Sequence, residues 1–354
     1  MIRRAPTIRD VARLAGVSTA TVSNVLGNRK PVDPALAERV HHAAREIGYR
    51  VHRGASQLRS GRAKVIAMLV PSLENTFFTA LIAAIERCTR ASGYEIIVGS
   101  ANESEEIEES RLAALLSWRP AGVIIVPCAD RFSSRRLLAE ERMPFVVADR
   151  VAPGLECDCV TIGNARAAAL AAEHLLELGH RDILVAASSL SLANIRERCA
   201  GIAGVVESVA GARMEVMELG ITFESCAARI GARIAAGGLP SAVVALTNYT
   251  TTALLAAFTR MGARLPEDVS LVGFDDYAWM QAYSPPITAI RQPVDRIAEE
   301  IWACLSARMA GDAGPALHVE LPAELEIRQT TRAAHGPFEL REAVQIRKRN
   351  KAHG

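Results

Sequence analysis

Long hydrophobic runs are missing from this sequence of 354 residues. No stretch approaches the roughly eighteen consecutive apolar residues that a membrane-spanning helix needs. The N-terminus, Met1-Ile-Arg-Arg, opens no apolar signal segment. We therefore expect an intracellular protein with no membrane partner. Half of the residues are nevertheless hydrophobic, which is ample for a large buried core.

Cysteine is scattered and follows no metal-binding pattern. The seven cysteines include one close pair, Cys157-Asp-Cys159, which lacks the second pair and the histidines of a zinc site. An odd number of cysteines also argues against a complete set of disulfides. We expect a protein of the reducing cytoplasm with no metal and no cofactor.

The motifs of common enzyme classes are missing as well. No glycine-rich phosphate fingerprint follows an early strand, where Val70-Pro-Ser-Leu-Glu-Asn75 stands instead. No Ser-His-Asp or Cys-His group stands out, and the histidines are interpreted as surface or helix-end residues. We expect no enzymatic activity.

Charge of each sign is concentrated in different parts of the chain. Residues 1–64 carry 13 Lys and Arg against 4 Asp and Glu, residues 65–331 carry 22 against 33, and residues 332–354 carry 6 against 2. A basic head on an acidic body indicates that the head meets a polyanion such as nucleic acid. The basic tail, residues 332–354, is predicted to be disordered, and an extra nonspecific DNA contact is its alternative role.

The first fifty residues have the pattern of a helix-turn-helix. Thr7 and Asp10 form a capping-box-like start, Gly16 is suited to end the first helix, and Ser18 can cap the second. A third helix is predicted to begin at Asp33-Pro34 and to end at Gly48. The outward side chains of the second helix are small enough to enter a DNA groove. A three-helix bundle with incidental charge is the alternative.

From residue 65 onward, short apolar runs alternate with longer helical stretches, which indicates parallel sheets with helices on both faces. The pattern divides near 159–163, so we expect two doubly wound lobes with a ligand cleft at the carboxyl ends of the strands. The predicted strands are Val65–Val70, Glu95–Val98, Gly122–Val126, Phe145–Ala148, Asp182–Ala187, Met214–Met217, Ala242–Leu246 and Val269–Gly273. The predicted helices include Phe77–Ala91, Glu105–Ser117, Ala165–Leu178, Phe223–Ala236 and Thr250–Met261.

Several motifs in a consistent order resemble the LacI/GalR family of bacterial transcription repressors over roughly residues 6–331. They are Asp10-Val-Ala-Arg-Leu-Ala-Gly-Val-Ser18, Ala20-Thr-Val-Ser23, Asn75-Thr-Phe-Phe78, His174-Leu-Leu-Glu-Leu-Gly-His-Arg181, Arg198-Cys-Ala-Gly201, Asp268-Val-Ser-Leu-Val-Gly-Phe-Asp-Asp276, Pro285-Pro-Ile-Thr288 and Glu324-Leu-Glu-Ile-Arg328.

The resemblance implies a DNA-binding domain (1–50), a hinge helix and linker (51–62), and a two-lobed body like the periplasmic sugar-binding proteins (63–331). The chain would cross between the lobes near 159–163 and 287–293. It also implies a homodimer, or a larger assembly, on a near-palindromic double-stranded DNA operator in the nucleoid. A small-molecule effector would control that binding through allostery.

In the head, the resemblance places Thr19 and Ala20 at base edges and Thr21 and Ser23 at phosphates. Asn24 stands where many members have arginine, and asparagine prefers adenine where arginine prefers guanine. In the hinge, Leu58 would wedge into the minor groove at the operator centre, and a leucine that simply packs is the alternative. The predicted DNA-binding residues are Thr7, Ser18, Thr19, Ala20, Thr21, Ser23, Asn24, Asn28, Ala55 and Leu58.

In the body, the resemblance implies a pocket for a sugar or sugar derivative, while nucleosides and phosphorylated effectors stay open. Arg198 and Asp275 would bond a diol, with a plain interlobe salt bridge as the alternative. Phe77 or Phe223 would stack on the ring or else pack in the core, and Phe78 is expected to be structural. The predicted effector-binding residues are Asn75, Phe77, Asp149, Arg198, Phe223, Asn248, Asp275 and Gln292.

Other functions remain as alternatives. A solute-binding protein or an enzyme could use the same two-lobed body, and a DNA-bending architectural protein would explain the head alone. Activation in place of repression stays open, because it depends on where the operator lies relative to a promoter.

Overall fold

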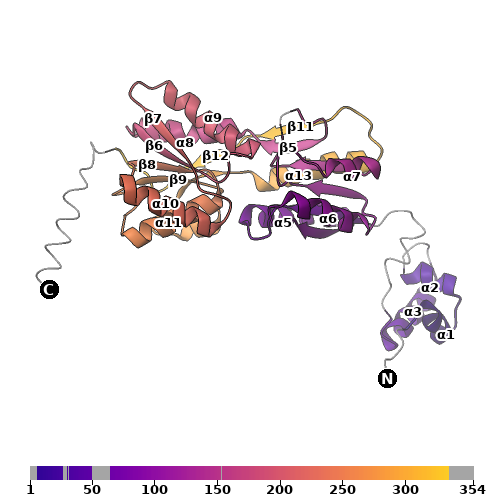
Figure 1. Cartoon of the computed structure of the whole chain (residues 1–354). Coiled ribbons are helices and arrows are strands. Elements are labelled where there is room, and N and C mark those ends of the chain that lie inside the picture. Colours follow the sequence, from indigo (N-terminus) through magenta and orange to yellow (C-terminus); the bar gives the residue numbers. More distant parts are fainter. Residues whose placement is uncertain (1–5, 27–29, 31, 50–63, 153, 335–354) are drawn as a thin grey trace, which may run out of the picture. The chain divides into compact units, whose positions relative to one another are not determined.

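The computed structural model describes residues 6–26, 30, 32–49, 64–152 and 154–334. The chain divides into two compact units, Met1–Lys64 and Val65–Gly354 (Figure 1). The predicted hinge helix and linker, residues 51–62, lie outside the described residues. The first unit is called the head and the second the body.

The head is a bundle of three short helices: α1 (Ile8–Ala15), α2 (Thr19–Leu26) and α3 (Pro34–Glu46). The predicted start of α1 is confirmed, because the Thr7 hydroxyl and amide donate to Asp10 Oδ2 at 2.7 and 2.9 Å. Gly16 ends this helix in the left-handed conformation at a φ of 63°. Fully buried valines from all three helices form the small core: Val11, Val22 and Val40.

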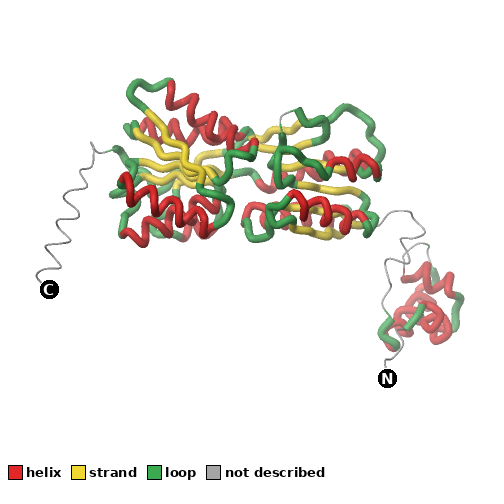
Figure 2. The backbone as a smooth tube through the Cα atoms, viewed as in Figure 1, coloured by secondary structure: helices red, strands yellow, loops and turns green. Residues whose placement is uncertain are grey.

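The body holds two six-stranded sheets (Figures 1 and 2). In the first sheet the order is β11-β5-β4-β3-β1-β2 and every pair is parallel. In the second the order is β12-β10-β9-β8-β6-β7, and only β12 is antiparallel to its neighbour. The predicted α/β class with two doubly wound lobes is confirmed.

The lobe built on the first sheet is called the N-lobe, and the other the C-lobe. The N-lobe elements are β1 (Val65–Val70), α5 (Thr76–Ala91), β2 (Glu95–Ser100), α6 (Glu105–Leu116), β3 (Gly122–Ile125), α7 (Arg135–Glu140), β4 (Phe145–Ala148), β5 (Cys159–Ile162), α13 (Val294–Met309) and β11 (His318–Leu321). The C-lobe elements are α8 (Asn164–Glu177), β6 (Asp182–Ala187), α9 (Ala193–Glu207), β7 (Arg213–Glu218), α10 (Phe223–Gly237), β8 (Ala242–Ala245), α11 (Asn248–Met261), β9 (Ser270–Phe274), α12 (Ala278–Ala282), β10 (Thr288–Arg291) and β12 (Glu324–Glu326).

Central strands are buried on both faces because helices cover both. In β1, Ile66, Met68 and Val70 belong to one apolar cluster, whereas Ala67 and Leu69 belong to another on the opposite face. This alternation follows from the two-residue period of a strand. It explains why the central strands read as continuous apolar runs.

The chain passes between the lobes three times. The passages follow β5 at Gly163, β10 at Gln292–Pro293, and β11 between Leu321 and Glu324. The third passage has no counterpart among the sequence predictions, since β11 and β12 are short and largely polar.

Two sequence predictions need correction at the C-lobe. Residues 332–334, assigned to a disordered tail, are hydrogen-bonded to the lobe: the Arg332 amide donates to Ser270 Oγ and the Ala334 amide to the Leu178 carbonyl. His180, taken for a surface or helix-end residue, is buried. Its ring nitrogens lie 3.0 to 3.1 Å from the hydroxyls of Ser241 and Ser270. Residues 335–354 lie outside the described part of the chain.

Helices α8 and α9 approach each other closely at a glycine. A Cβ atom on Gly201 of α9 would lie 2.0 Å from the Ala165 carbonyl oxygen of α8, closer than any side chain allows. Gly204, one turn further along α9, has no neighbour within 4 Å of the equivalent position. Gly201 therefore sets the distance between the two helices, and with it the position of Arg198 one turn earlier.

We predict that Gly201→Ala lowers the free energy of unfolding of the body by about 1–3 kcal/mol, because a backbone oxygen must move to admit the methyl group. Gly204→Ala is the matched control. It should be neutral or stabilise by up to about 1 kcal/mol, since alanine is the better helix former. Urea unfolding of both variants checks this, and equal effects at the two positions would contradict the helix-approach argument.

Candidate functional site

The start of α2 is an exposed part of the head. Thr19 and Ala20 are exposed, and they follow Ser18, whose Oγ accepts the Thr21 amide proton at 3.1 Å. The predicted capping role of Ser18 is therefore confirmed. Thr21, Ser23 and Asn24 are half-buried on the same helix. Thr7 lies at the start of α1, while Asn28, Ala55 and Leu58 lie outside the described residues.

Arg39 of α3 contacts the turn between α1 and α2. Its guanidinium donates to the Ala15 carbonyl at the end of α1 with a distance of 2.6 Å, directly beside Gly16. The contact links the turn between α1 and α2 to the third helix. The turn that precedes the exposed start of α2 is therefore stabilised by a contact with α3.

In the body, a narrow cleft pocket of about 40 Å³ lies between the two lobes. It lies where β1, β4, β6, β8, β9 and β10 end, as expected of doubly wound sheets. Both lobes contribute to its lining: Asn75, Phe77, Phe78, Asp149 and Arg150 from the N-lobe, and Ser188, Leu192, Asn194, Ile195, Arg198, Thr247, Asp275 and Gln292 from the C-lobe.

Arg198 is the more buried of the two arginines that line this pocket. Its Nε donates to Asn164 Oδ1 at 2.9 Å and its Nη1 to the Leu246 carbonyl at 2.7 Å. The guanidinium also lies 3.7 Å from the centre of the Phe274 ring. Burial lowers the pKa of Arg198, and the nearby carboxylates of Asp149 and Asp275 oppose this effect. Arg198 and Asp275 lie in the same lobe, so the alternative of a salt bridge between lobes is wrong.

The two cleft aspartates are held in an unusual backbone conformation. Asp149 has a φ of 60° and Asp275 a φ of 67°, in the left-handed region that non-glycine residues seldom occupy. Burial raises the pKa of both carboxyl groups, and that of Asp275 reaches about 6. Asp275 Oδ1 accepts a hydrogen bond from Gln292 Nε2 at 2.6 Å. Such strain and desolvation are typical of binding sites.

Arg150 is a lining residue that the sequence reasoning left out of the predicted set. It donates to both carboxylate oxygens of Glu103, at 2.6 and 2.9 Å, and lies 5.5 Å from the centre of the Phe78 ring. Burial lowers the pKa of Arg150, but the hydrogen bonds to Glu103 outweigh that effect and raise it. The charge of Arg150 is therefore neutralised within the protein.

Three buried amide oxygens around the cleft have no partner among the described residues: Asn194 Oδ1, Asn248 Oδ1 and Gln292 Oε1. A buried acceptor without a hydrogen bond is costly, by about 1–3 kcal/mol. Each of the three oxygens can accept a hydrogen bond from a donor. Asn194 and Gln292 line the cleft pocket, so a ligand with several donor groups would satisfy their oxygens.

Six of the eight predicted effector-binding residues line the cleft pocket, and two do not. Phe223 packs at the edge of the C-lobe core, and Asn248 lies near the site, where its backbone lowers the pKa of Asp275. Phe78, expected to be structural only, does line the pocket. Some lining residues were not predicted although they follow β6, which was a predicted strand: Ser188, Leu192, Asn194 and Ile195. Their position after a strand could have indicated a place in the cleft.

Direct contacts hold the two lobes together beside the pocket. Asp130, which follows β3 of the N-lobe, accepts the Ala193 amide proton at 2.9 Å and a hydrogen bond from Arg196 at 2.5 Å, both on α9. Asn194 Nδ2 lies 3.4 Å from Asp149 Oδ2 across the cleft. In this structure the two lobes are therefore in direct contact through α9.

Comparison with protein families matches both parts of the chain. Residues 7–51 match the model of the bacterial regulatory proteins of the lacI family, and residues 172–331 match a periplasmic binding protein-like domain. Among the described residues, no helix is both long and apolar enough to cross a membrane.

Whole-chain relatives agree with these matches. The chain is 33% identical to the HTH-type transcriptional regulator PtxS of Pseudomonas putida, over 93% of this chain and 97% of the relative. It is 29% identical to the HTH-type transcriptional repressor PurR of Vibrio atlanticus, over 86% and 92% of the two chains.

Solved structures agree as well. A lac repressor dimer bound to operator and the anti-inducer ONPF matches with a TM-score of 0.81, 27% identity, and coverage of 93% of this chain and 100% of that one. A complex of the transcriptional regulator CelR with cellobiose matches with a TM-score of 0.70, 26% identity, and coverage of 92% and 100%.

The fold and the exposed helix-turn-helix define a DNA-binding regulator of transcription. The chain belongs to the lacI family of bacterial regulatory proteins.

The raised pKa of Asp275 predicts a pH-dependent stability. Its folded value of about 6 lies above the ordinary 3.8, so its contribution is complete below pH 4 and is lost as the pH rises through 6. Asp275→Asn keeps the acceptor for Gln292 and removes the charge. We expect the variant to gain up to about 2–3 kcal/mol relative to wild type between pH 4 and pH 7.

Urea unfolding at both pH values measures this difference. Asp295→Asn, at an exposed position on α13, is the control for a simple change in net charge. A difference between Asp275→Asn and wild type that stays constant with pH would show that the Asp275 carboxyl titrates alike in the folded and unfolded chains.

Proposed function

We propose that this chain is a repressor that binds a near-palindromic operator as a homodimer, and that a small molecule in the interlobe cleft controls this binding. The observation that carries the proposal is the cleft pocket itself. Both lobes contribute polar side chains to it, so a bound molecule would bridge them. The similarity of the chain to a lac repressor that was solved as a dimer on its operator supports the same arrangement.

In this proposal the head reads DNA through the exposed start of α2. Thr19 and Ala20 contact base edges in the major groove, and Thr21, Ser23 and nearby backbone amides contact phosphates. Asn24 selects adenine where an arginine would select guanine. In the hinge, Leu58, with Ala55 beside it, forms a wedge in the minor groove at the operator centre.

The proposed effector is a neutral molecule rich in hydroxyl groups, such as a sugar. The amide oxygens of Asn194 and Gln292, which accept from no described residue, require donors. Phe77 offers a face for the apolar side of a ring. A phosphorylated effector is disfavoured, because Arg150 is already paired with Glu103 and Arg198 faces two aspartates. The body binds the effector without transforming it.

Coupling between effector and operator is proposed to run through the lobe contacts. The cleft pocket, at about 40 Å³, is far smaller than the roughly 300–1,000 Å³ of small-molecule sites, so the lobes must move apart to admit a sugar. That movement changes the arrangement in which Asp130 contacts α9. Any ligand that favours one arrangement shifts the population toward it. The DNA affinity changes if the two arrangements hold the two heads differently.

The experiment that tests the DNA-binding proposal is selection of bound duplexes from a random pool by the full-length protein at near-physiological salt. A near-palindrome with an easily kinked centre is the expected result. Binding without a motif, which vanishes as salt increases, would reduce the interaction to charge attraction. Reporter transcription from the selected site distinguishes repression from activation.

We predict that Arg198→Ala abolishes the effector response while operator affinity changes by less than about twofold, since the residue lies in the cleft and not in the head. The effector is found first, by a thermal-shift screen of pentoses, hexoses, disaccharides and hexose phosphates. Fluorescence anisotropy with the selected operator then reads the response. Arg213→Ala, on an exposed C-lobe strand, is the control. A normal response in Arg198→Ala would remove Arg198 from the proposed site.

We predict that Leu58→Ala weakens binding to the selected operator by about tenfold or more and binding to random DNA by less than about twofold. An inserted leucine stabilises only a site that can be kinked at its centre. Titration of both duplexes at two salt concentrations measures the ratio. Equal losses on the two duplexes would exclude a wedge.

A second head variant tests base reading. Asn24→Arg should change the selected base within each half-site from adenine toward guanine. An unchanged selected sequence would show that Asn24 contacts only the backbone of the DNA.

A further inference from the structure

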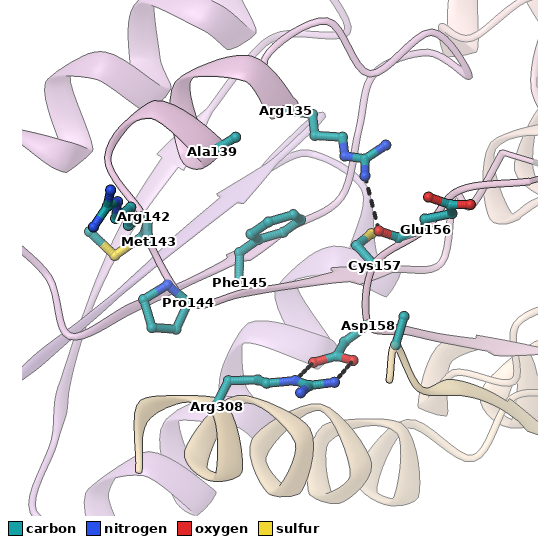
Figure 3. A pocket seen from close by; sticks show the side chains of 11 residues that line it. Arg135, Ala139, Arg142, Met143, Pro144, Phe145, Glu156, Cys157, Asp158 and Arg308 are labelled. Atoms are coloured by element: carbon teal, nitrogen blue, oxygen red, sulfur yellow. Dashed lines mark hydrogen bonds and ion pairs between the residues drawn. The ribbon is translucent and has the colours of Figure 1, made fainter. Parts of the chain in front are cut away.

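A second cavity, of about 410 Å³, opens on the N-lobe at the opposite end of the sheet from the cleft (Figure 3). It lies where β4, β5 and β11 begin, whereas the cleft lies where strands end. None of its lining residues lines the cleft pocket. The lining is Arg135, Ala139, Arg142, Met143, Pro144, Phe145, Glu156, Cys157, Asp158, Arg308 and Ala316.

The floor of this cavity is apolar. In Figure 3 the Phe145 ring lies at its centre, between Arg135 of α7 and Arg308 of α13. The ring is braced from behind by Phe132, with which it makes an edge-to-face contact at 6.3 Å. Burial raises the pKa of the Cys157 thiol to about 12, so this sulfur stays protonated and forms a neutral wall. The floor can therefore pack a flat apolar group.

The charges around the floor leave an excess of positive charge. Asp158 and Arg308 cancel each other through two hydrogen bonds of 2.7 and 2.8 Å. Burial would raise the pKa of Asp158, but the bonds from Arg308 and the Leu317 amide outweigh it and lower the pKa. What remains is Arg135 and Arg142 against one carboxylate, Glu156.

Arg135 is held in place by a hydrogen bond to a backbone carbonyl, but no carboxylate of a described residue forms an ion pair with it. Its Nη2 donates to the Glu156 backbone carbonyl at 3.0 Å, and the contact holds the guanidinium at the side of the cavity formed by Glu156 and Cys157 (Figure 3). No ion pair between described residues involves Arg135 or Arg142. Most arginines of the acidic body, by contrast, contact a carboxylate, as Arg136 does on the same helix. A guanidinium with a free edge beside an apolar floor matches a carboxylate joined to an apolar group.

We propose that this cavity is a second ligand site, which binds a small carboxylic acid with an aromatic body. The ring packs on Phe145 and Met143, and the carboxylate accepts hydrogen bonds from Arg135. The volume lies within the range of small-molecule sites. The site also adjoins a conformational element, because Cys157 and Asp158 lead directly into β5, after which the chain first passes to the C-lobe.

The test uses full-length protein and three probes: 3-phenylpropionate, 3-phenylpropan-1-ol, which has the same ring and chain length, and acetate. Saturation-transfer NMR and isothermal titration calorimetry measure their binding. We expect 3-phenylpropionate to bind at least about tenfold more tightly than either the alcohol, which lacks the charge, or acetate, which lacks the ring. Binding of 3-phenylpropionate no tighter than that of the alcohol would overturn the proposal.

Two variants of charged lining residues, Arg135 and Glu156, have opposite expected effects and locate the site. These two positions are called the rim of the cavity. Arg135→Gln should weaken 3-phenylpropionate by about fivefold or more, and Glu156→Gln should strengthen it by about twofold, because a repelling rim charge is removed. Arg198→Ala, in the cleft, should leave the affinity unchanged. If Arg198→Ala removes binding while the rim variants keep it, the probe occupies the cleft and the second site does not exist.

Discussion

The cleft between the lobes depends on the contacts of one buried group, the guanidinium of Arg198. A charge taken out of water is costly unless hydrogen bonds and opposite charges surround it. Here the Asn164 amide oxygen, the Leu246 carbonyl and the face of Phe274 surround it, with the carboxylates of the cleft nearby. Asn164 begins α8 and Arg198 lies on α9, so this arrangement requires the two helices to approach closely. A glycine at 201 is what permits that approach.

The same cleft holds polar groups that no described residue satisfies. Asp149 and Asp275 are buried, their pKa values are raised, and their backbones are in the left-handed region. Amide oxygens of Asn194 and Gln292 lack partners among the described residues. A donor-rich ligand would relieve these costs, and it would do so only where both lobes surround it. In the proposed function, this chemistry of the lining couples ligand binding to the arrangement of the lobes.

The sequence predicted the fold best where the pattern was strong. Central strands such as Val65–Val70 and Asp182–Ala187 were placed at their observed bounds, because strands buried on both faces are continuous apolar runs. Four strands were missed, β5, β10, β11 and β12, since each is only three or four residues long and includes polar residues that break an apolar run. Consequently the third passage between the lobes was missed too. The caps of α1 and α2 were predictable from Thr7, Gly16 and Ser18, whose chemistry is local.

The candidate cleft was predictable only in part. Residues that directly follow predicted strands, such as Asp149 and Asp275, could be found by position. The pairing of Arg150 with Glu103 joins loops 47 residues apart, and nothing local indicates it. Phe223 was left open between the cleft and the core, because an aromatic residue at a helix start can face either. Its packing against the C-lobe core agrees with the second alternative.

The cleft and the DNA-binding head are coupled only if effector and operator each change the affinity of the protein for the other. Measuring this reciprocal effect is the most direct test of the proposed function. Calorimetry would measure the affinity of the identified effector for the free protein and for the protein saturated with its selected operator. If the cleft controls DNA binding, the two affinities differ by the same factor by which the effector changes operator affinity. Identical effector affinities for the free and the operator-bound protein would contradict the account, because the two sites would then be thermodynamically independent.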